Sequence, residues 1–356
     1  MVEIIESDIL VEGEGITAAA LAYFLSRNNP NKSINLILKE TEGLNRSHFN
    51  PGILIPIFQF PDSQINIVFQ RNIALLDELS SITQDFEFSQ NPLLLLYRDK
   101  IAISKMSDHR EKLINGNINH KILNLEEIES YYPFIKTEDE IHVTEIYKSY
   151  TCSNPYDLFI AFRKLAEEND VYIVREKERI SLKGKKKLGT SSTEYLAREL
   201  AFTTSNHNQM KEELRKSSLI RIVTPIFERF PKISIFDASI ASFMWLEESG
   251  YFHIFRSLDR GKIKESIESI QREFEKTFAF SGELDILDAS FKKIESLNKI
   301  NNSLGYLQEN DMYYLNIPPH FELSLSPIIS DKISRLSEER LDLIKQPNAM
   351  FKIFKN

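Results

Sequence analysis

The hydrophobic positions at the start of the chain follow a strand pattern, then a helix pattern, then a strand pattern again. Residues 7–12 (SDILVE) form a short, mainly apolar run, as expected of a parallel strand buried on both faces. Two glycines follow, and residues 16–27 (ITAAALAYFLSR) combine strong helix formers with apolar positions at helical spacing. After a polar turn, residues 34–40 (INLILKE) form a second apolar run. This order predicts a β–α–β unit with a glycine turn after its first strand.

Farther along the chain, strand patterns become more frequent than helix patterns. Helices are predicted for residues 65–84, 125–134, 153–170, 263–278, 286–297 and 325–344. Strands are predicted for residues 140–150, 171–176, 179–185, 195–204 and 311–317, within 219–254, and within 91–104 on both sides of a turn at Arg98–Asp99. Alternating strands and helices followed by consecutive strands are typical of a doubly wound α/β domain interrupted by an antiparallel-sheet domain.

Composition narrows the classes of partner and location. The 356 residues suffice for two domains of roughly 100–200 residues each. A formal net charge of −8 gives no global attraction to nucleic acid or to an anionic membrane. No apolar run approaches the ~20 residues that span a bilayer, and no secretory signal is evident, so a cytoplasmic protein is expected. Cys152 is the one cysteine, and His253 and His320 lack partners at metal-ligand spacing, so neither an internal disulfide nor a metal site is expected.

The glycine turn carries most of a dinucleotide-binding pattern. Gly13 and Gly15 match its first two glycines, and Ala18 stands at the third, where a single extra methyl is tolerated. The following helix N-terminus offers N–H groups to a phosphate, and Glu40 is placed to accept hydrogen bonds from ribose hydroxyls. Glu14 opposes this interpretation, because a carboxylate beside a diphosphate repels it. A β–α–β unit without a cofactor therefore stays open as an alternative.

Beyond this turn, several stretches along nearly the whole chain resemble one family, the FAD-dependent oxidoreductases typified by D-amino-acid oxidase, glycine oxidase and sarcosine oxidase. They are SDILVEGEGITAAALAYFLS, NRSHFNPGIL from Asn45, LNLEEIESYYPFI, SNPYDLFIAFRKLAEENDVYIV, GYFHIFRSLDRGK from Gly250 and FELSLSPIISDKISRL. The resemblance implies FAD as cofactor, a Rossmann-like FAD-binding domain and an interleaved antiparallel substrate domain. The implied FAD-binding domain comprises residues 1–85, 140–215 and 300–356, and the substrate domain comprises 86–139 and 216–299.

The resemblance also implies site residues. Those for the cofactor are Gly13, Gly15, Ile16, Ala18, Lys39 and Glu40 on the ADP half, and Ser47, His48, Asn50 and Gly52 near the flavin ring. Those for the substrate are Arg256, which would bind a carboxylate, and Tyr251, which would line the cavity; an ion pair of Arg256 with Asp259 and core packing of Tyr251 are the structural alternatives.

The chain also departs from the family pattern. Ser205 replaces a glycine after the strand at 195–204, and the last flavin loop (IPPHFELSLSP) has no glycine. Pro318 and Pro319 remove backbone donors from that loop, and Lys299 is the only cation in the stretch that precedes it where an arginine is usual.

The resulting functional prediction is oxidation of a small amine or amino acid by hydride transfer to flavin. The alternative is a catalytically silent relative that serves as a structural or partner-binding subunit, with a protein partner or a homo-oligomer. A nicotinamide dehydrogenase is the weaker third interpretation, because no clear second β–α–β unit follows the first.

Overall fold

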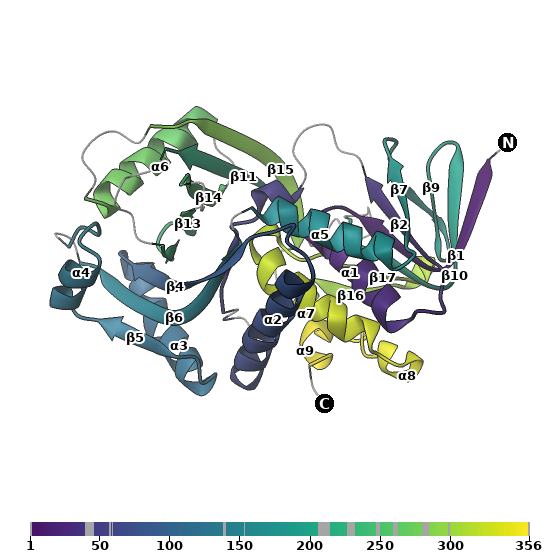
Figure 1. The fold of residues 1–356 in the computed structure, drawn as a ribbon, viewed down its shortest axis with the longest axis horizontal. Coiled ribbons are helices and arrows are strands. Elements are labelled where there is room, and N and C mark those ends of the chain that lie inside the picture. Colours follow the sequence, from purple (N-terminus) through teal and green to yellow (C-terminus); the bar gives the residue numbers. More distant parts are fainter. Residues whose placement is uncertain are drawn as a thin grey trace.

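The computed structural model describes residues 2–39, 46–56, 58, 60–137, 140–152, 154–205, 214–225, 232–246, 250–258, 263–279, 285–297 and 300–354. Within these residues the chain builds two sheets, called here the first and the second sheet. Figure 1 shows them in opposite halves of the molecule, with the N-terminus at the outer end of β1, on the side away from the second sheet. The predicted combination of a doubly wound domain with a largely antiparallel domain is confirmed.

The first sheet has a parallel centre. Its strand order is β16 (Leu304–Leu307), β17 (Met312–Leu315), β10 (Thr193–Thr203), β1 (Glu3–Gly13), β2 (Ile34–Lys39) and β7 (Tyr172–Glu176), with the hairpin β8 (Ser181–Gly184) and β9 (Lys187–Gly189) added through β10. From β17 to β7 all neighbours are parallel. The chain passes from β1 to β2 on one side, and β10 lies on the other, so the strand order reverses at β1. In open α/β sheets, ligands bind at such a reversal, beyond the carboxyl ends of the strands.

Helix α1 (Gly15–Asn28) lies at the centre of the packing around this sheet. Every residue from Gly15 to Ser26 is buried, because α5 (Pro155–Glu168) and α7 (Glu322–Ser334) both pack against it. A helix that is covered on several sides needs apolar or small residues all round, and the run of alanines in α1 meets this need. Helix α2 (Asp62–Ile82) packs on α7 in turn.

The second sheet is antiparallel except for one pair. Its order is β15 (Asp288–Leu297), β11 (Leu214–Thr224), β14 (Phe252–Leu258), β13 (Ser242–Leu246), β12 (Ser234–Asp237), β4 (Phe88–Tyr97), β6 (His142–Cys152) and β3 (Ile53–Leu54), with β5 (His120–Leu123) paired to β6 and the parallel pair between β4 and β12. Helices α3 (Lys100–Asn115), α4 (Leu125–Tyr131) and α6 (Ile263–Thr277) accompany it. The remaining elements are η1 (Arg46–Phe49), η3 (Ile300–Asn302), η4 (Gln308–Asn310), η5 (Pro319–Phe321), α8 (Glu338–Leu341) and α9 (Ala349–Lys352).

The two faces of the second sheet have different neighbours. Ile220, Ile254 and Leu258 share a buried cluster with Phe274 of α6, which Figure 1 shows on the outer side of this sheet. Side chains at alternate positions point to the opposite face, and there Leu219 joins the large cluster that contains α1 and α7. The face of the second sheet that carries Leu219 is therefore turned toward the first domain.

Three predicted elements differ from the structure. The stretch after β4 is helix α3 instead of a strand, because the Asp99 carboxylate caps it by accepting the Ala102 N–H at 2.7 Å. Residues 286–297, predicted as a helix, form mainly strand β15, which pairs along its length with β11. The predicted terminal helix is divided, because α7 ends at Ser334 and α8 follows. The domain boundaries stay a prediction, and β6, which they assign to the first domain, pairs within the second sheet.

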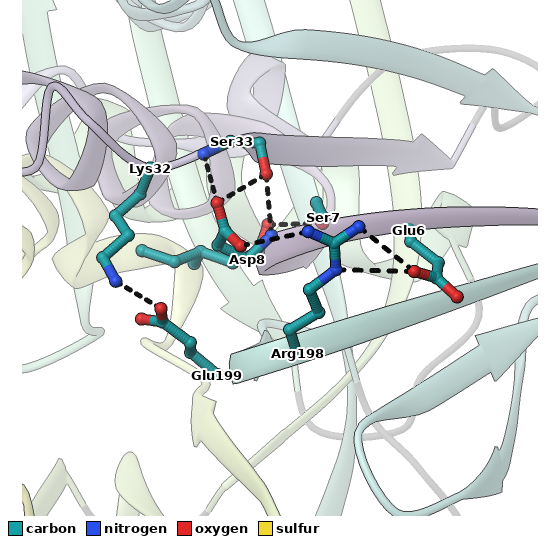
Figure 2. A network of polar contacts seen from close by, with 8 residues as sticks. Glu6, Ser7, Asp8, Lys32, Ser33, Arg198 and Glu199 are labelled. Atoms are coloured by element: carbon teal, nitrogen blue, oxygen red, sulfur yellow. Dashed lines mark hydrogen bonds and ion pairs between the residues drawn. The ribbon is translucent and has the colours of Figure 1, made fainter.

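A polar network fixes the amino end of the first sheet (Figure 2). The register between β1 and β10 shifts between Ser7 and Ile9, and Arg198 pairs with Glu6 at 3.2 Å and with Asp8 at 3.8 Å across this irregularity. The Asp8 carboxylate also accepts the Ser33 N–H at 2.8 Å, and this bond lowers the pKa of Asp8. Because these groups are largely exposed, the network contributes little stability, and its effect is to align β1 with the turn before β2.

A buried ion pair holds the second sheet near α6. Arg98 follows β4 and its guanidinium binds Asp237 through Nη2 at 2.5 Å and Nε at 2.9 Å. Asp237 is fully buried, whereas Glu273 of α6, 3.7 Å from Arg98, is partly exposed.

We expect Asp237→Ala to lower the free energy of unfolding by about 3–5 kcal/mol, because it leaves the largely buried Arg98 guanidinium without its main partner. Glu273→Ala is the matched control and should cost less than about 1 kcal/mol. Urea denaturation followed by circular dichroism measures both. Equal losses for the two variants would contradict this account of the pair.

Candidate functional site

The turn after β1 has the backbone that its glycines predict. Gly13 has φ of 153° and Gly15 has φ of 74°, a region that L-residues rarely adopt. A Cβ built on Gly13 would lie 1.7 Å from Thr204 Oγ1, just after β10. Gly13 is thus required by the close approach of Thr204 as well as by the turn. The same hypothetical Cβ lies 3.4 Å from the Ala18 methyl, so Ala18 is tolerated at ordinary contact distance.

The N-terminus of α1 opens at the carboxyl end of the first sheet. Its first turn contains no acidic residue, and Glu14 at the cap makes no side-chain hydrogen bond to the helix. The Ile16 N–H donates to Ser47 Oγ at 3.0 Å. Aligned N–H groups and the helix dipole favour an anion at this position. The structure therefore brings Gly13, Gly15, Ile16 and Ser47 together around one potential anion site.

The loop after η1 is clamped between the two domains. Asn50 donates from Nδ2 to the Pro319 carbonyl at 2.7 Å, and its Oδ1 accepts the Gly52 N–H at 3.1 Å. Gly52 has φ of 58°, and a Cβ there would lie 2.5 Å from the Cys152 carbonyl oxygen and 3.3 Å from Trp245. This loop consequently touches both the C-terminal segment before α7 and the second sheet.

Two of the predicted cofactor residues lie at the margins of this arrangement. The His48 ring stacks on Tyr156 of α5, with centroids 4.1 Å apart. Lys39 ends β2 and is exposed, while Glu40 lies outside the described residues. Asp259, named as an alternative ion-pair partner of Arg256, and Lys299 also lie outside them.

A buried carboxylate lies beside the turn and links the ends of β1 and β10. Glu12 of β1 is 1% exposed and accepts hydrogen bonds from Thr203 Oγ1 and Ser205 Oγ, both at 2.6 Å. Ser205 is the residue that replaces the family glycine. The Ser205 hydroxyl therefore has a structural role. A glycine at residue 205 would leave one oxygen of the buried Glu12 carboxylate without that donor.

Four charged side chains meet where α1, η1, α7 and β15 converge, and we call them the four-charge cluster: Glu14, Arg46, Lys292 and Glu322. Arg46 Nε lies 2.7 Å from Glu322 Oε1, and Lys292 Nζ lies 3.4 Å from Glu14 Oε2. Glu322 is fully buried, and burial raises the pKa of its carboxyl group to about 7 although Arg46 acts to lower it. Burial likewise lowers the pKa of the Lys292 ammonium group.

None of these four charged groups was predicted to be functional, apart from the repulsion expected of Glu14. The signals were present: Arg46 adjoins Ser47, and Glu322 stands within the last loop that lacks its glycines. What sequence did not show is that the two are partners.

The second sheet offers a cation on the face turned toward the first domain. Arg221 of β11 alternates with Ile220 and Ile222, which belong to the cluster under α6, so it points to the opposite face. Its Nη2 lies 3.1 Å from His253 Nδ1, and the His253 ring stacks on Trp245 with centroids 4.9 Å apart. Because a Cβ added at Gly52 would lie 3.3 Å from the Trp245 ring, these side chains extend from beside the loop after η1 to Arg221.

The structure places one of the two predicted substrate residues on the opposite face of the second sheet. Arg256 shares the α6 face with Ile254 and Leu258. Burial lowers the pKa of its guanidinium, although the acids Glu273 and Asp237 act to raise it. Tyr251, just before β14, is 44% exposed. Arg256 therefore lies apart from the group around Arg221, and a role for Tyr251 stays a prediction.

Within the described residues, no group of three or more metal-ligating side chains lies together, and no helix is long and apolar enough to cross a membrane.

Comparison with known proteins adds the family. The family model described as "FAD dependent oxidoreductase" (DAO) matches residues 8–263. No curated protein sequence matches the chain.

Several solved structures share the fold. L-proline dehydrogenase from P. horikoshii is 16% identical with a TM-score of 0.77, covering 99% of each chain. Glycine oxidase from Geobacillus kaustophilus is 15% identical with a TM-score of 0.77, also covering 99% of each chain. L-α-glycerophosphate oxidase from Mycoplasma pneumoniae, determined with FAD bound, is 15% identical with a TM-score of 0.72, and the match covers 92% of this chain and 93% of that one. At such low identities these likenesses establish the fold, and the family model, which spans more than half of the chain, establishes membership: this protein belongs to the DAO family of FAD-dependent oxidoreductases.

Proposed function

We propose that the protein binds FAD at the turn after β1 and oxidises a small amine or amino acid. The observation that carries this proposal is the anion site at the N-terminus of α1, in a chain that belongs to an FAD-dependent family. When bound, FAD would supply the hydride acceptor for the carbon that carries the amine; with loss of a proton from the nitrogen this would give an imine, which water would hydrolyse. The chain's own residues would hold the cofactor and the substrate in place.

The residues around the turn fit the diphosphate of FAD. Gly13 and Gly15 keep side chains out of the approach to the backbone. Thr204 Oγ1, beside Gly13, is buried without a hydrogen-bond partner among the described residues, which is a position where an incoming oxygen would satisfy it. We infer that the diphosphate lies against the first turn of α1, with Ile16, Ala18 and Ser47 around it, and that the end of β2 at Lys39 and Glu40 lies toward the ribose.

The clamped loop after η1 supports a position for the flavin ring. Asn50 and Gly52 hold this loop between the C-terminal segment and Trp245. A flavin ring beside this loop would face the side of the second sheet that carries Arg221. His48, which lies within η1 just before this loop, is also proposed to stand near the flavin ring.

The substrate class rests on Arg221 and on the neighbouring structures. An arginine binds a carboxylate through two parallel donors, and Arg221 is a cation on the sheet face turned toward the first domain. The solved relatives named above include a proline dehydrogenase and a glycine oxidase. An amino acid is accordingly the favoured substrate, and no comparison supports the alternative of a structural subunit without flavin.

The first prediction locates the diphosphate. We expect the wild-type protein to bind FAD, with flavin absorbance near ~450 nm, and Ser47→Asp to weaken that binding roughly a hundredfold. The reason is that two negative charges about 5 Å apart repel by about 3 kcal/mol at an effective dielectric constant of about 20. Titration of apoprotein with FAD, followed by flavin fluorescence, measures the dissociation constant.

Ser47→Asn is the control for this change, because it matches aspartate in size but carries no charge, and its affinity should stay well above that of Ser47→Asp. If Asp and Asn at residue 47 have the same effect on affinity, the diphosphate does not lie beside Ser47.

The second prediction distinguishes the two arginines. Arg221→Met should raise KM for an amino-acid substrate about 10- to 100-fold, because one charge-assisted interaction is worth about 1.5–3 kcal/mol. An amine substrate without a carboxylate should be affected much less. Steady-state kinetics on a panel of amino acids and their decarboxylated amines supplies the measurement.

Arg256→Met is the matched control on the opposite face of the same sheet, and its KM should stay close to that of the wild type in folded protein. A larger KM effect at Arg256 than at Arg221 would return the substrate to the position that the sequence resemblance suggested.

A further inference from the structure

The N-termini of α1 and α7 meet at one point. Thr17, in the first turn of α1, lies 2.8 Å from Ser326 of α7 through their hydroxyl oxygens, and 3.4 Å from the carboxylate of Glu322. Glu322 is the first residue of α7. Two helix N-termini that converge in this way create a region of positive potential in the protein interior.

The anion in this region is part of the chain itself. The Glu322 carboxylate is fully buried, with Oε1 paired to Arg46 and with Oε2 lacking a hydrogen-bond partner among the described residues. Arg46 also donates to the Ile317 carbonyl, so its guanidinium is held at the segment before α7. A buried carboxylate with one unpaired oxygen is energetically costly. An anion with a fuller set of partners can therefore replace Glu322 in its ion pair with Arg46.

The same partners suit the diphosphate that the proposed function places at α1. A guanidinium binds phosphate oxygens in two-pronged fashion, and Arg46 is adjacent in sequence to Ser47, whose hydroxyl lies at the first turn of α1. Glu322 and the cofactor would therefore need the same cation and the same positive region, and their negative charges exclude each other.

We propose that the Glu322 carboxylate is an internal competitor of FAD, which occupies Arg46 and the meeting point of α1 and α7 until the ion pair opens and the cofactor binds. This inference rests on the proposed function and extends it to the control of cofactor binding. The Glu322 side chain is the competing group, and Arg46 passes from the carboxylate to the cofactor.

The charge state of Glu322 then controls the affinity for FAD. The titratable and charged groups that face it are Glu14, Arg46, Lys292 and the buried His320. Burial lowers the pKa of His320 to about 4, so this ring stays neutral between pH 6 and 8. With the pKa of Glu322 raised to about 7, this carboxyl group loses its charge as the pH falls across the same range, and its competition with the diphosphate ends.

The experiment measures the FAD dissociation constant of apoprotein at pH 6 and at pH 8 by flavin fluorescence. If only the protonated carboxyl group permits binding, the wild type binds about tenfold more tightly at pH 6 than at pH 8. Glu322→Gln should bind about tenfold more tightly than the wild type at pH 8 and should lose the pH dependence. Thermal unfolding of each variant with and without FAD shows that the protein measured is folded.

Asp331→Asn is the matched control, because Asp331 is a second buried carboxylate of α7, paired with Arg335 at 2.8 Å. Its affinity and pH dependence should equal those of the wild type. The wild-type pH profile tests the proposal even where Glu322→Gln fails to fold.

The outcomes separate this inference from the proposed function. Binding of FAD by the wild type with an affinity that is independent of pH, or weaker binding by folded Glu322→Gln, overturns the competition and leaves the cofactor assignment intact. Binding by Glu322→Gln where the wild type binds weakly supports both. If neither protein binds FAD at either pH, both proposals fail, and the alternative of a catalytically silent relative replaces them.

Discussion

The arrangement of this protein depends on how negative charge is accommodated at the buried N-terminus of α1. The helix is covered by α5 and α7, so its free N–H groups and its dipole act in a region that water does not screen. Any carboxylate placed there gains from the helix and loses its hydration, and it persists only with a specific partner. The structure meets this constraint through the four-charge cluster, which joins elements of the first domain to a strand of the second sheet.

This constraint gives the domain interface a polar as well as an apolar component. The face of the second sheet that is turned toward α1 contributes Leu219 to the shared core, and directly opposite it in the ladder stands Lys292, which reaches Glu14 at the turn after β1. A buried or half-buried ion pair adds little net stability compared with an apolar contact. The effect of the pair between Lys292 and Glu14 is to fix the position of β15 against the turn at which the cofactor is proposed to bind.

Sequence patterns predicted the β1–α1–β2 unit well because each of its features is local. The apolar runs, the two glycines and the alanine-rich helix carry their meaning within a few residues. Strand β15 was mispredicted because ASFKKIESL has helix formers, whereas pairing with β11 along its length decides its conformation. The start of α3 was missed because Asp99 was interpreted as a turn residue, although an aspartate serves equally as a helix cap.

The same limit applied to the site, because only its local features could be predicted from the sequence. The glycines lie at α1, as a motif centred on residues 13–18 implies. Ser47, which the resemblance placed near the flavin ring, instead bonds to the first turn of α1, and Arg256 lies on the α6 face of the second sheet. Whether a strand residue faces a site or the opposite cluster depends on a register that changes by one residue with any bulge. Arg221, on the other face, had no sequence feature to distinguish it from the other arginines of the chain.

The residues that depart from the family pattern share one physical feature, which is that each has an identifiable polar partner. Ser205 stands where a glycine is usual, and its hydroxyl satisfies the buried carboxylate of Glu12. Glu322 stands in a loop that has lost its glycines, and Arg46 neutralises it. Loss of function by unconstrained substitution would leave buried charges without partners, at a cost of several kcal/mol each. Here each acid beside the turn is matched by a donor from a distant segment, so these departures from the family pattern keep the buried charges paired.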